Sequence, residues 1–202
     1  MATDQHVLTL RGREIVDWLP AVARLRIAVF RDYPYLYDGD VAYEERYLAS
    51  FAQAPDSVLV LVLSGEQVVG ASTGLPLANT EPGFQAPFHE RGMPVDEVFY
   101  CAESVLLPDY RGLGFGHRFF DEREAHARAL GTVRWTSFAA VDRDVGDPRR
   151  PSDYRGNDLF WTRRGYVRQP AMSMRLAWKQ IGEARETEQF LTFWMRKLEA
   201  VE

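Results

Sequence analysis

The chain has 202 residues, 46% of them hydrophobic, and this composition excludes a disordered chain and can supply a full core. The net charge of −5 lacks the basic excess of nucleic-acid binders, and the single cysteine, Cys101, excludes an intrachain disulfide framework. The N-terminus is polar, and the longest apolar run, Val58 to Leu63, is too short to span a membrane. We therefore expect a cytoplasmic protein that contacts neither nucleic acid nor membrane.

The first half of the chain predicts two helices and a β-hairpin after a short first strand. Asp17 is the expected N-cap of the first helix, and tyrosines at 33, 35 and 37 lie in the loop before the second helix. The segment 78–94 is rich in proline, glycine and charge and is expected to be a loop. The expected strands are 6–11, 58–63 and 68–77, and the expected helices are 17–30 and 41–53.

The second half predicts a long strand, a helix and further short elements. The expected strands are 98–107, 132–141 and 172–178, and the expected helices are 116–130, 158–164 and 186–199. Phe190, Trp194 and Leu198 would share one face of the closing helix. The loop 142–156 is long enough to suspect a function.

This order of elements predicts one α+β domain over residues 1–202. It would be layered α/β/α, with a mixed, largely antiparallel sheet of about six to seven strands flanked by helices. The core would cover about 6–178, and 179–202 would form a C-terminal helical extension. That extension could close the monomer or form the seam of a homodimer.

Three glycines at alternate positions follow the long strand: Gly112, Gly114 and Gly116. They leave backbone N–H groups uncovered, and the next helix points its positive dipole end to the same place. This predicts a phosphate or pyrophosphate site, the alternative being a tight strand-to-helix turn. A P-loop would need lysine where His117 stands, and a dinucleotide fold would place the loop after its first strand.

The segment from Arg111 to Gly116 fits Arg/Gln-x-x-Gly-x-Gly/Ala and, with Leu106-x-Pro108 upstream, resembles the acetyl-CoA signature of the GNAT acetyltransferases. The segment Phe160–Tyr166 resembles the aromatic-x-x-x-Gly-aromatic block that ends a later helix in that family. The resemblance covers about residues 13–178 and implies the GNAT fold with acetyl-CoA as acyl donor. The four histidines fit no common zinc spacing, so no metal is expected.

By this resemblance, backbone amides from Arg111 through His117 would hold the CoA pyrophosphate. Leu106 and Leu107 would offer backbone hydrogen bonds to the pantetheine arm, which lies beside the strand. Trp161 would pack against the cofactor or in the core. The implied cofactor-binding residues are Leu106, Leu107, Arg111, Gly112, Leu113, Gly114, Phe115, Gly116, His117, Asn157 and Trp161.

On the acceptor side, the resemblance implies that Glu103 is the general base, the alternative being a solvent-facing or arginine-paired glutamate. Cys101, two residues before Glu103, would lie on the same face of the strand as Glu103 unless a bulge intervenes. Tyr35 and Tyr37 lie in the segment that walls the acceptor site in the family.

Trp161 stands where many relatives have a tyrosine that protonates the leaving thiolate, so the usual general acid is missing. Tyr154 or Tyr166 could replace it only if the fold brings one close. The expected reaction moves an acetyl group from acetyl-CoA to a primary amine of a small molecule or peptide by direct transfer in a ternary complex. A longer acyl donor and a non-catalytic acyl-CoA-binding sensor or partner protein remain as alternatives.

Overall fold

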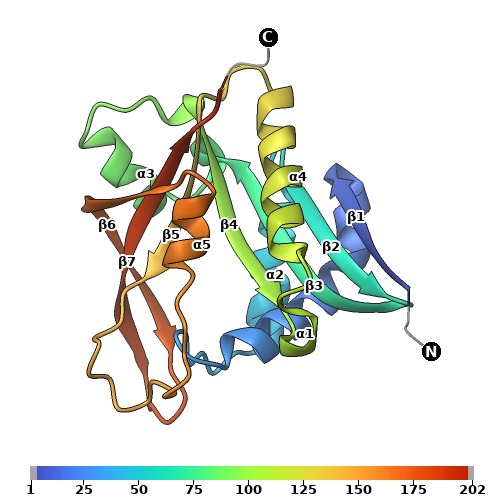
Figure 1. The fold of residues 1–202 in the computed structure, drawn as a ribbon. Coiled ribbons are helices and arrows are strands. Elements are labelled where there is room, and N and C mark those ends of the chain that lie inside the picture. Colours follow the sequence, from blue (N-terminus) through green and yellow to red (C-terminus); the bar gives the residue numbers. More distant parts are fainter. Residues whose placement is uncertain (1–3, 200–202) are drawn as a thin grey trace.

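Seven strands form one sheet in the order β1-β2-β3-β4-β5-β7-β6 in the computed structural model, which describes residues 4–199 (Figure 1). Neighbouring strands are antiparallel except β4 and β5, which are parallel. The mixed, largely antiparallel sheet is therefore confirmed, and the ends of the expected domain, 1–3 and 200–202, lie outside the described residues. The strands are β1 Gln5–Arg11, β2 Val58–Ser64, β3 Gln67–Pro76, β4 Val98–Leu106, β5 Trp135–Val141, β6 Val167–Lys179 and β7 Glu186–Lys197.

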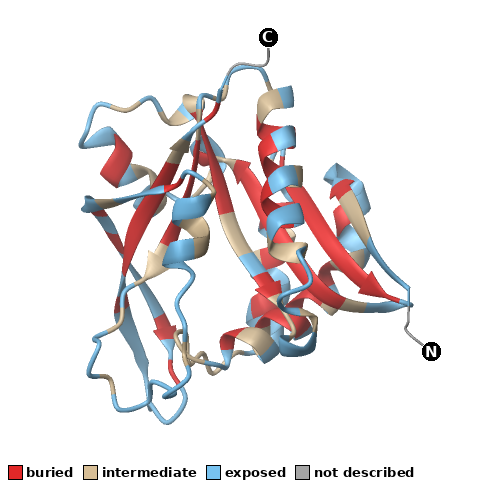
Figure 2. Cartoon of the chain, viewed as in Figure 1, coloured by how far each residue is buried: buried red, intermediate tan, exposed pale blue. Residues whose placement is uncertain are grey.

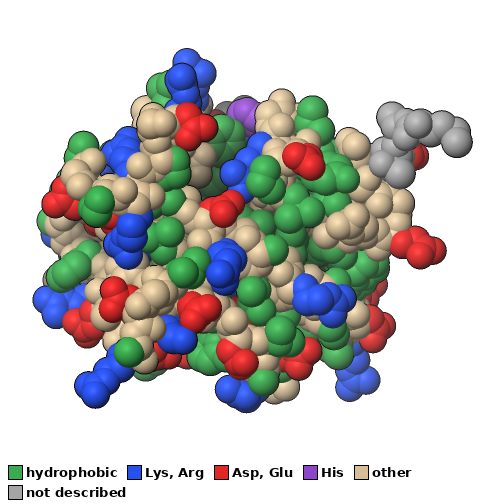
Figure 3. All heavy atoms as spheres, turned by 90° about the horizontal axis from the view of Figure 1, so that it is seen from below, with side chains coloured by type: hydrophobic (Ala, Val, Ile, Leu, Met, Phe, Trp, Pro, Cys, Tyr) green, Lys and Arg blue, Asp and Glu red, His purple; other side chains and the backbone are tan. Residues whose placement is uncertain are grey.

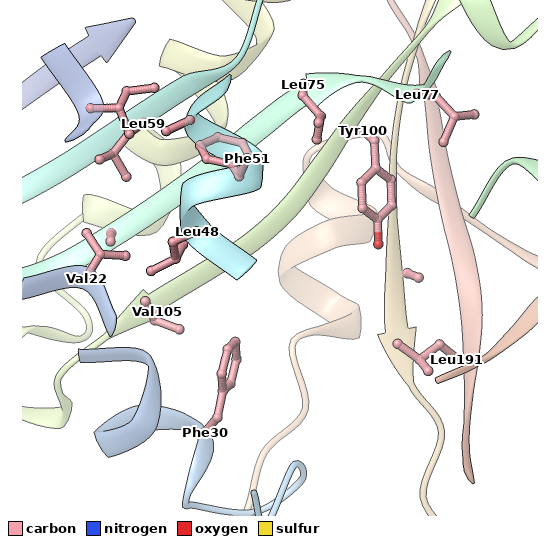
Figure 4. Close-up of a cluster of buried hydrophobic side chains, with 14 of the residues drawn as sticks. Val22, Phe30, Leu48, Phe51, Leu59, Leu75, Leu77, Tyr100, Val105 and Leu191 are labelled. Atoms are coloured by element: carbon pink, nitrogen blue, oxygen red, sulfur yellow. The ribbon is translucent and has the colours of Figure 1, made fainter. Parts of the chain in front are cut away.

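Helices cover both faces of the sheet. On one face, α1 and α2 pack Val22 and Leu48 against Leu59 of β2 (Figure 4). On the other face, α4 packs Phe119 against Val60 of the same strand. Because β2 is covered on both faces, all its residues are buried, which explains its unbroken apolar sequence (Figure 2). The helices are α1 Leu19–Phe30, α2 Val41–Gln53, α3 Pro82–His89, α4 Phe115–Ala129 and α5 Asp158–Arg163, with 3-10 segments at Gly12–Trp18, Leu77–Asn79, Val95–Glu97 and Pro108–Tyr110.

The middle of the sheet opens between β4 and β5. The two strands pair only over 98–100 and 135–137 and then diverge (Figure 1). Pairing with β3 also shifts here, because Thr73 lies opposite Glu103 but Leu75 lies opposite Tyr100, which leaves one extra residue in β4. Because of the extra residue, side chains after the bulge point to the opposite face of the sheet from the one that simple alternation predicts. Cys101 therefore packs on the α4 side, whereas Glu103 meets α1 on the opposite face.

The expected C-terminal helix over 186–199 is wrong, because Glu186–Lys197 forms strand β7 between β5 and β6. Residues four apart share a face in a strand as well as in a helix, so the spacing of Phe190 and Trp194 fitted both. Leu191 and Phe193 fill the other face, and burial on both faces hides the alternation of a strand. The extension is part of the sheet, and the described residues up to 199 contain no C-terminal helix.

Three smaller expectations also differ from the structure. Within the expected loop 78–94, residues Pro82–His89 form α3, which begins with proline in its first turn and buries Phe88 against Phe193. The first helix begins at Leu19 rather than at Asp17, which lies inside the preceding 3-10 segment. The strand expected over 172–178 begins earlier, at Val167.

Candidate active site

The glycine loop forms an anion-binding turn at the N-terminus of α4. Gly112 and Gly114 have φ angles of +77° and +89°, and a Cβ built on either would meet no atom within 4 Å. The amide of Arg111 donates to Pro108, and that of His117 donates to Gly114. The amides between them have no intrahelical acceptor, because the first turn of a helix leaves its N–H groups free. The loop thus presents uncovered amides and a positive helix end to one place.

The end of β4 presents its backbone to the gap between β4 and β5. The Leu107 amide donates to Val69 of β3 at 2.9 Å, so the backbone groups of Leu106 point the other way, toward β5. Arg111 Nε donates to the Leu106 carbonyl at 3.1 Å and ties the loop to the strand. Leu106 therefore offers backbone groups at the gap, whereas the amide of Leu107 is already bonded within the sheet.

Helix α5 lies against the start of α4. A Cβ on Gly116 would stand 3.4 Å from the Phe160 ring, at ordinary van der Waals contact. The His117 ring packs on Phe160 with centroids 4.9 Å apart, and Arg164 lies 3.3 Å from His117 Nδ1. Leu113 is exposed in the loop, and Phe115 is the first residue of α4.

The structure places the two remaining cofactor candidates at α5. The Trp161 ring lies 4.8 Å from Phe138 and 5.2 Å from Trp194, inside an aromatic cluster on the α4 side of the sheet. Asn157 is exposed at the N-cap position of α5, and its side chain makes no capping bond. Of the two interpretations of Trp161, packing in the core fits these contacts.

On the other face of the sheet, Glu103 belongs to a buried ion-pair cluster. Arg26 of α1 forms ion pairs with Glu103 and with Glu44 of α2. The guanidinium also lies over the rings of Phe30 and Tyr47, at 5.1 and 4.7 Å from their centroids. Glu103 is therefore paired with an arginine whose side chain lies in the core, rather than facing solvent.

Sequence reasoning missed Arg26 and Glu44, although each leaves a signal. Arg26 stands midway between Val22 and Phe30 at helical spacing, so it falls on the buried stripe of α1. Glu44 precedes Leu48 by four residues on the buried face of α2. A charged residue on a buried stripe needs a partner of opposite charge, and Arg26 and Glu44 are partners of each other.

Aromatic residues from the tyrosine loop surround this cluster. The Tyr35 ring lies 4.5 Å from Phe30 and 5.9 Å from Trp178, whose indole N–H donates to the Tyr35 carbonyl. Burial, followed by the charge of Glu103, raises the pKa of Tyr35 to about 12. Burial also raises the pKa of Tyr37, with Glu44 nearby. Both phenols therefore keep their protons at neutral pH.

The loop 142–156 is docked onto the tyrosine loop. Arg143 donates to the carbonyls of Pro34 and Tyr35 at 2.6 and 3.1 Å, and the Tyr154 ring meets Tyr33 at 4.6 Å. These contacts fix the loop 142–156 against the tyrosine loop. Arg143 also donates to Gln189 of β7, which anchors the same loop to the sheet.

Of the two candidate replacement acids, Tyr166 is bonded on the face of the sheet opposite to Glu103. The Tyr166 hydroxyl is buried on the α4 side, where it bonds Thr136 at 2.8 Å and Glu124 at 3.2 Å. Tyr154 stands in the docked loop, and burial raises its pKa. Within residues 4–199, no group of three or more His, Cys, Asp or Glu side chains could hold a metal ion, and no helix could cross a membrane.

The glycine loop therefore lies at the end of β4 on the α4 side of the sheet, and the ion-pair cluster lies on the α1 side of the same strand. Figure 3 looks onto the end of the molecule where β4 and β5 diverge and shows a hollow in its surface, with Lys or Arg side chains at the edge. A ligand that enters at the loop and passes along β4 would end beside Glu103.

Solved structures of acetyltransferases share this architecture over nearly the whole chain. A ribosomal-protein-alanine N-acetyltransferase from Brucella melitensis matches with 14% identity and a TM-score of 0.60, over 95% of this chain and 99% of its own. A GNAT-family acetyltransferase from Streptococcus pneumoniae matches with 12% identity and a TM-score of 0.58, over 97% and 100%. A Salmonella typhimurium protein described as a putative acetyltransferase, solved with its cofactor acetyl-CoA, matches with 11% identity and a TM-score of 0.55, over 98% and 95%.

At these identities the likeness establishes the fold. No family model matches the sequence, and no curated protein matches it. The likeness nevertheless agrees with the two sequence motifs, which stand in the order that the fold requires. The chain has the fold of the GNAT-family acetyltransferases.

Proposed function

We propose that the protein transfers an acetyl group from acetyl-CoA to a primary amine. The observation that carries this proposal is the placement of the glycine loop directly after β4, a strand whose pairing with β5 ends at residue 100 and which carries Glu103. A diphosphate suits the loop amides, and an extended arm suits the unpaired backbone of β4. The thioester would then lie at the level of Glu103.

The loop would hold the pyrophosphate through the amides between Arg111 and His117. Leu106 would align the pantetheine arm through backbone groups that face the gap. These contacts orient the donor without any covalent attachment to the protein, so donor and acceptor meet in one ternary complex.

Glu103 would accept the proton that the ammonium group of the acceptor must lose. The amine nitrogen then forms a bond to the carbonyl carbon and releases its second proton to water, the carbon–sulfur bond breaks, and the thiolate leaves with the electron pair. A backbone N–H near Leu106 would stabilise the negative charge on the carbonyl oxygen. Water would protonate the thiolate, because Trp161 carries no acidic proton and Tyr166 is bonded elsewhere.

Two measurements test this proposal. Calorimetric titration with CoA should give saturable binding, and absence of binding would overturn the proposal. Release of free thiol from acetyl-CoA should depend on an added primary amine and should fall strongly in Glu103→Gln. Propionyl-CoA and succinyl-CoA in the same assay would define the donor.

A second candidate is an acyl-CoA-binding protein without turnover. The pairing of Glu103 with Arg26 favours it, since the carboxylate already has a cationic partner, and so does the packing of Trp161 in an aromatic cluster. This candidate predicts CoA binding with no amine-dependent thiol release, so the same assay separates the two.

A further inference from the structure

The cluster of Arg26, Glu44 and Glu103 contains more acidic than basic side chains. One guanidinium lies between two carboxylates, so the ionised cluster carries one net negative charge. The side chains of Glu44 and Glu103 are 1% and 8% exposed, and little water reaches them to screen that charge. Within residues 4–199, Arg26 is the one cationic side chain that forms an ion pair with either carboxylate.

Each carboxylate also has an oxygen without a partner. Oε1 of Glu44 and Oε1 of Glu103 are buried and accept no hydrogen bond. Buried carboxylate oxygens in folded proteins nearly always accept one. The unpaired oxygen of Glu103 belongs to β4, whose pairing with β5 ends at residue 100, so a donor bound beside this strand would satisfy it.

The surroundings add aromatic faces but no compensating charge. Tyr47 and Tyr35 are partly buried near Glu103, and desolvation followed by the charge of that carboxylate raises the pKa of each. Both residues therefore stay neutral at physiological pH. Aromatic rings attract cations through their faces, so these walls favour a positively charged ligand over a negatively charged one.

We propose that the acceptor is a primary ammonium ion with no carboxylate beside its nitrogen, bound at the unpaired oxygen of Glu103. This inference rests on the proposed function, because it names the acceptor class for the same site. An ammonium supplies the missing positive charge and the missing hydrogen-bond donors. A carboxylate next to the amine would be placed near Glu103 and Glu44 and repelled. Simple amines and the amino ends of peptides fit this class, and free α-amino acids do not.

Three matched acceptors test the inference on the unaltered protein. Tyramine, tyrosine amide and tyrosine share one ring and one amine and differ in the group beside the amine. With saturating acetyl-CoA, kcat/KM for tyramine or tyrosine amide should exceed that for tyrosine by at least about tenfold. A higher value for tyramine identifies a small amine, and a higher value for the amide identifies a peptide-like acceptor. Equal or better use of tyrosine overturns the inference while acetyl transfer stands.

If none of the three amines is acetylated, the proposed function fails, and the affinities of the three amines for the protein test the inference about the acceptor class. Calorimetry on the protein with CoA present should then give tighter binding of tyramine or the amide than of tyrosine, again by at least about tenfold. Equal affinities, or no binding by any of the three, overturn the inference.

A charge-removing variant tests the physical cause. Glu44→Gln keeps the shape of the side chain and leaves one carboxylate for the guanidinium. The preference for tyramine over tyrosine should fall several-fold, mainly through the KM for tyramine, with CoA affinity unchanged. Glu188→Gln is the matched control, because Glu188 pairs with Arg175 on the exposed part of the sheet. An unchanged preference in Glu44→Gln overturns the inference, and if that variant does not fold, the acceptor series on the unaltered protein still decides.

Discussion

Substitution of Gly114 by alanine tests the glycine loop in a way that separates binding from stability. Gly114 has φ of +89° and caps α4, and a Cβ there meets no protein atom within 4 Å. Alanine introduces no clash but must adopt the left-handed conformation, at a cost of about 1–2 kcal/mol. For a chain of this length, that cost lowers Tm by about 2–8 °C.

The new methyl group occupies the open space through which a diphosphate would approach the amides. We therefore expect Gly114→Ala to weaken CoA binding by at least about tenfold, which is ~1.4 kcal/mol. The matched control is Gly182→Ala in the β6–β7 turn, where φ is +83° and a Cβ also meets no atom within 4 Å. Both variants should lose similar Tm, and only Gly114→Ala should lose CoA affinity in calorimetry. Equal CoA affinity in the two variants would refute the assignment of the loop.

Four further substitutions address the remaining parts of the molecule. Glu103→Gln should lower kcat/KM for the amine by about 10²–10⁴ with an unchanged Kd for CoA, and undiminished thiol release would exclude Glu103 as base. Arg26→Met should cost about 3–5 kcal/mol in urea unfolding, because it leaves two buried carboxylates without a cation, and a cost near zero would contradict the ion-pair cluster. Arg143→Met should raise the KM for the amine and speed proteolysis within 142–156, with CoA affinity unchanged, since it releases that loop from the tyrosine loop. Burial lowers the pKa of His126, so the folded state binds fewer protons than the unfolded state and stability falls as pH drops through about 6.5. The Tm of the unaltered protein should therefore fall more than that of His126→Gln between about pH 7.5 and 5.5, and parallel curves would refute this.

Local signals were sufficient to predict the glycine loop and the sheet around it. The role of Gly112 and Gly114 could be predicted without knowing their tertiary contacts, because it depends only on their backbone conformation. The β7 strand could not be predicted in the same way, since Phe190 and Trp194 satisfy helical and strand spacing alike. This segment forms a strand because it pairs with β5 along one edge and with β6 along the other.

The acceptor side depended still more on contacts between distant residues. Glu103 could be singled out from its place on the strand, but its partner Arg26 lies on another element far away in sequence. The bulge in β4, which turns Glu103 toward that partner, leaves no mark in the sequence around Cys101. The pairing of loop 142–156 with the tyrosine loop likewise appears only when the chain is folded.

The central claim is acetyl transfer through Glu103, and the most direct measurement is mass spectrometry of the amine after incubation with acetyl-CoA and the purified protein. The account predicts a tyramine product heavier by one acetyl group, formed in step with free CoA and strongly reduced in Glu103→Gln. Saturable CoA binding without any acetylated amine, or equal product from Glu103→Gln, would contradict it.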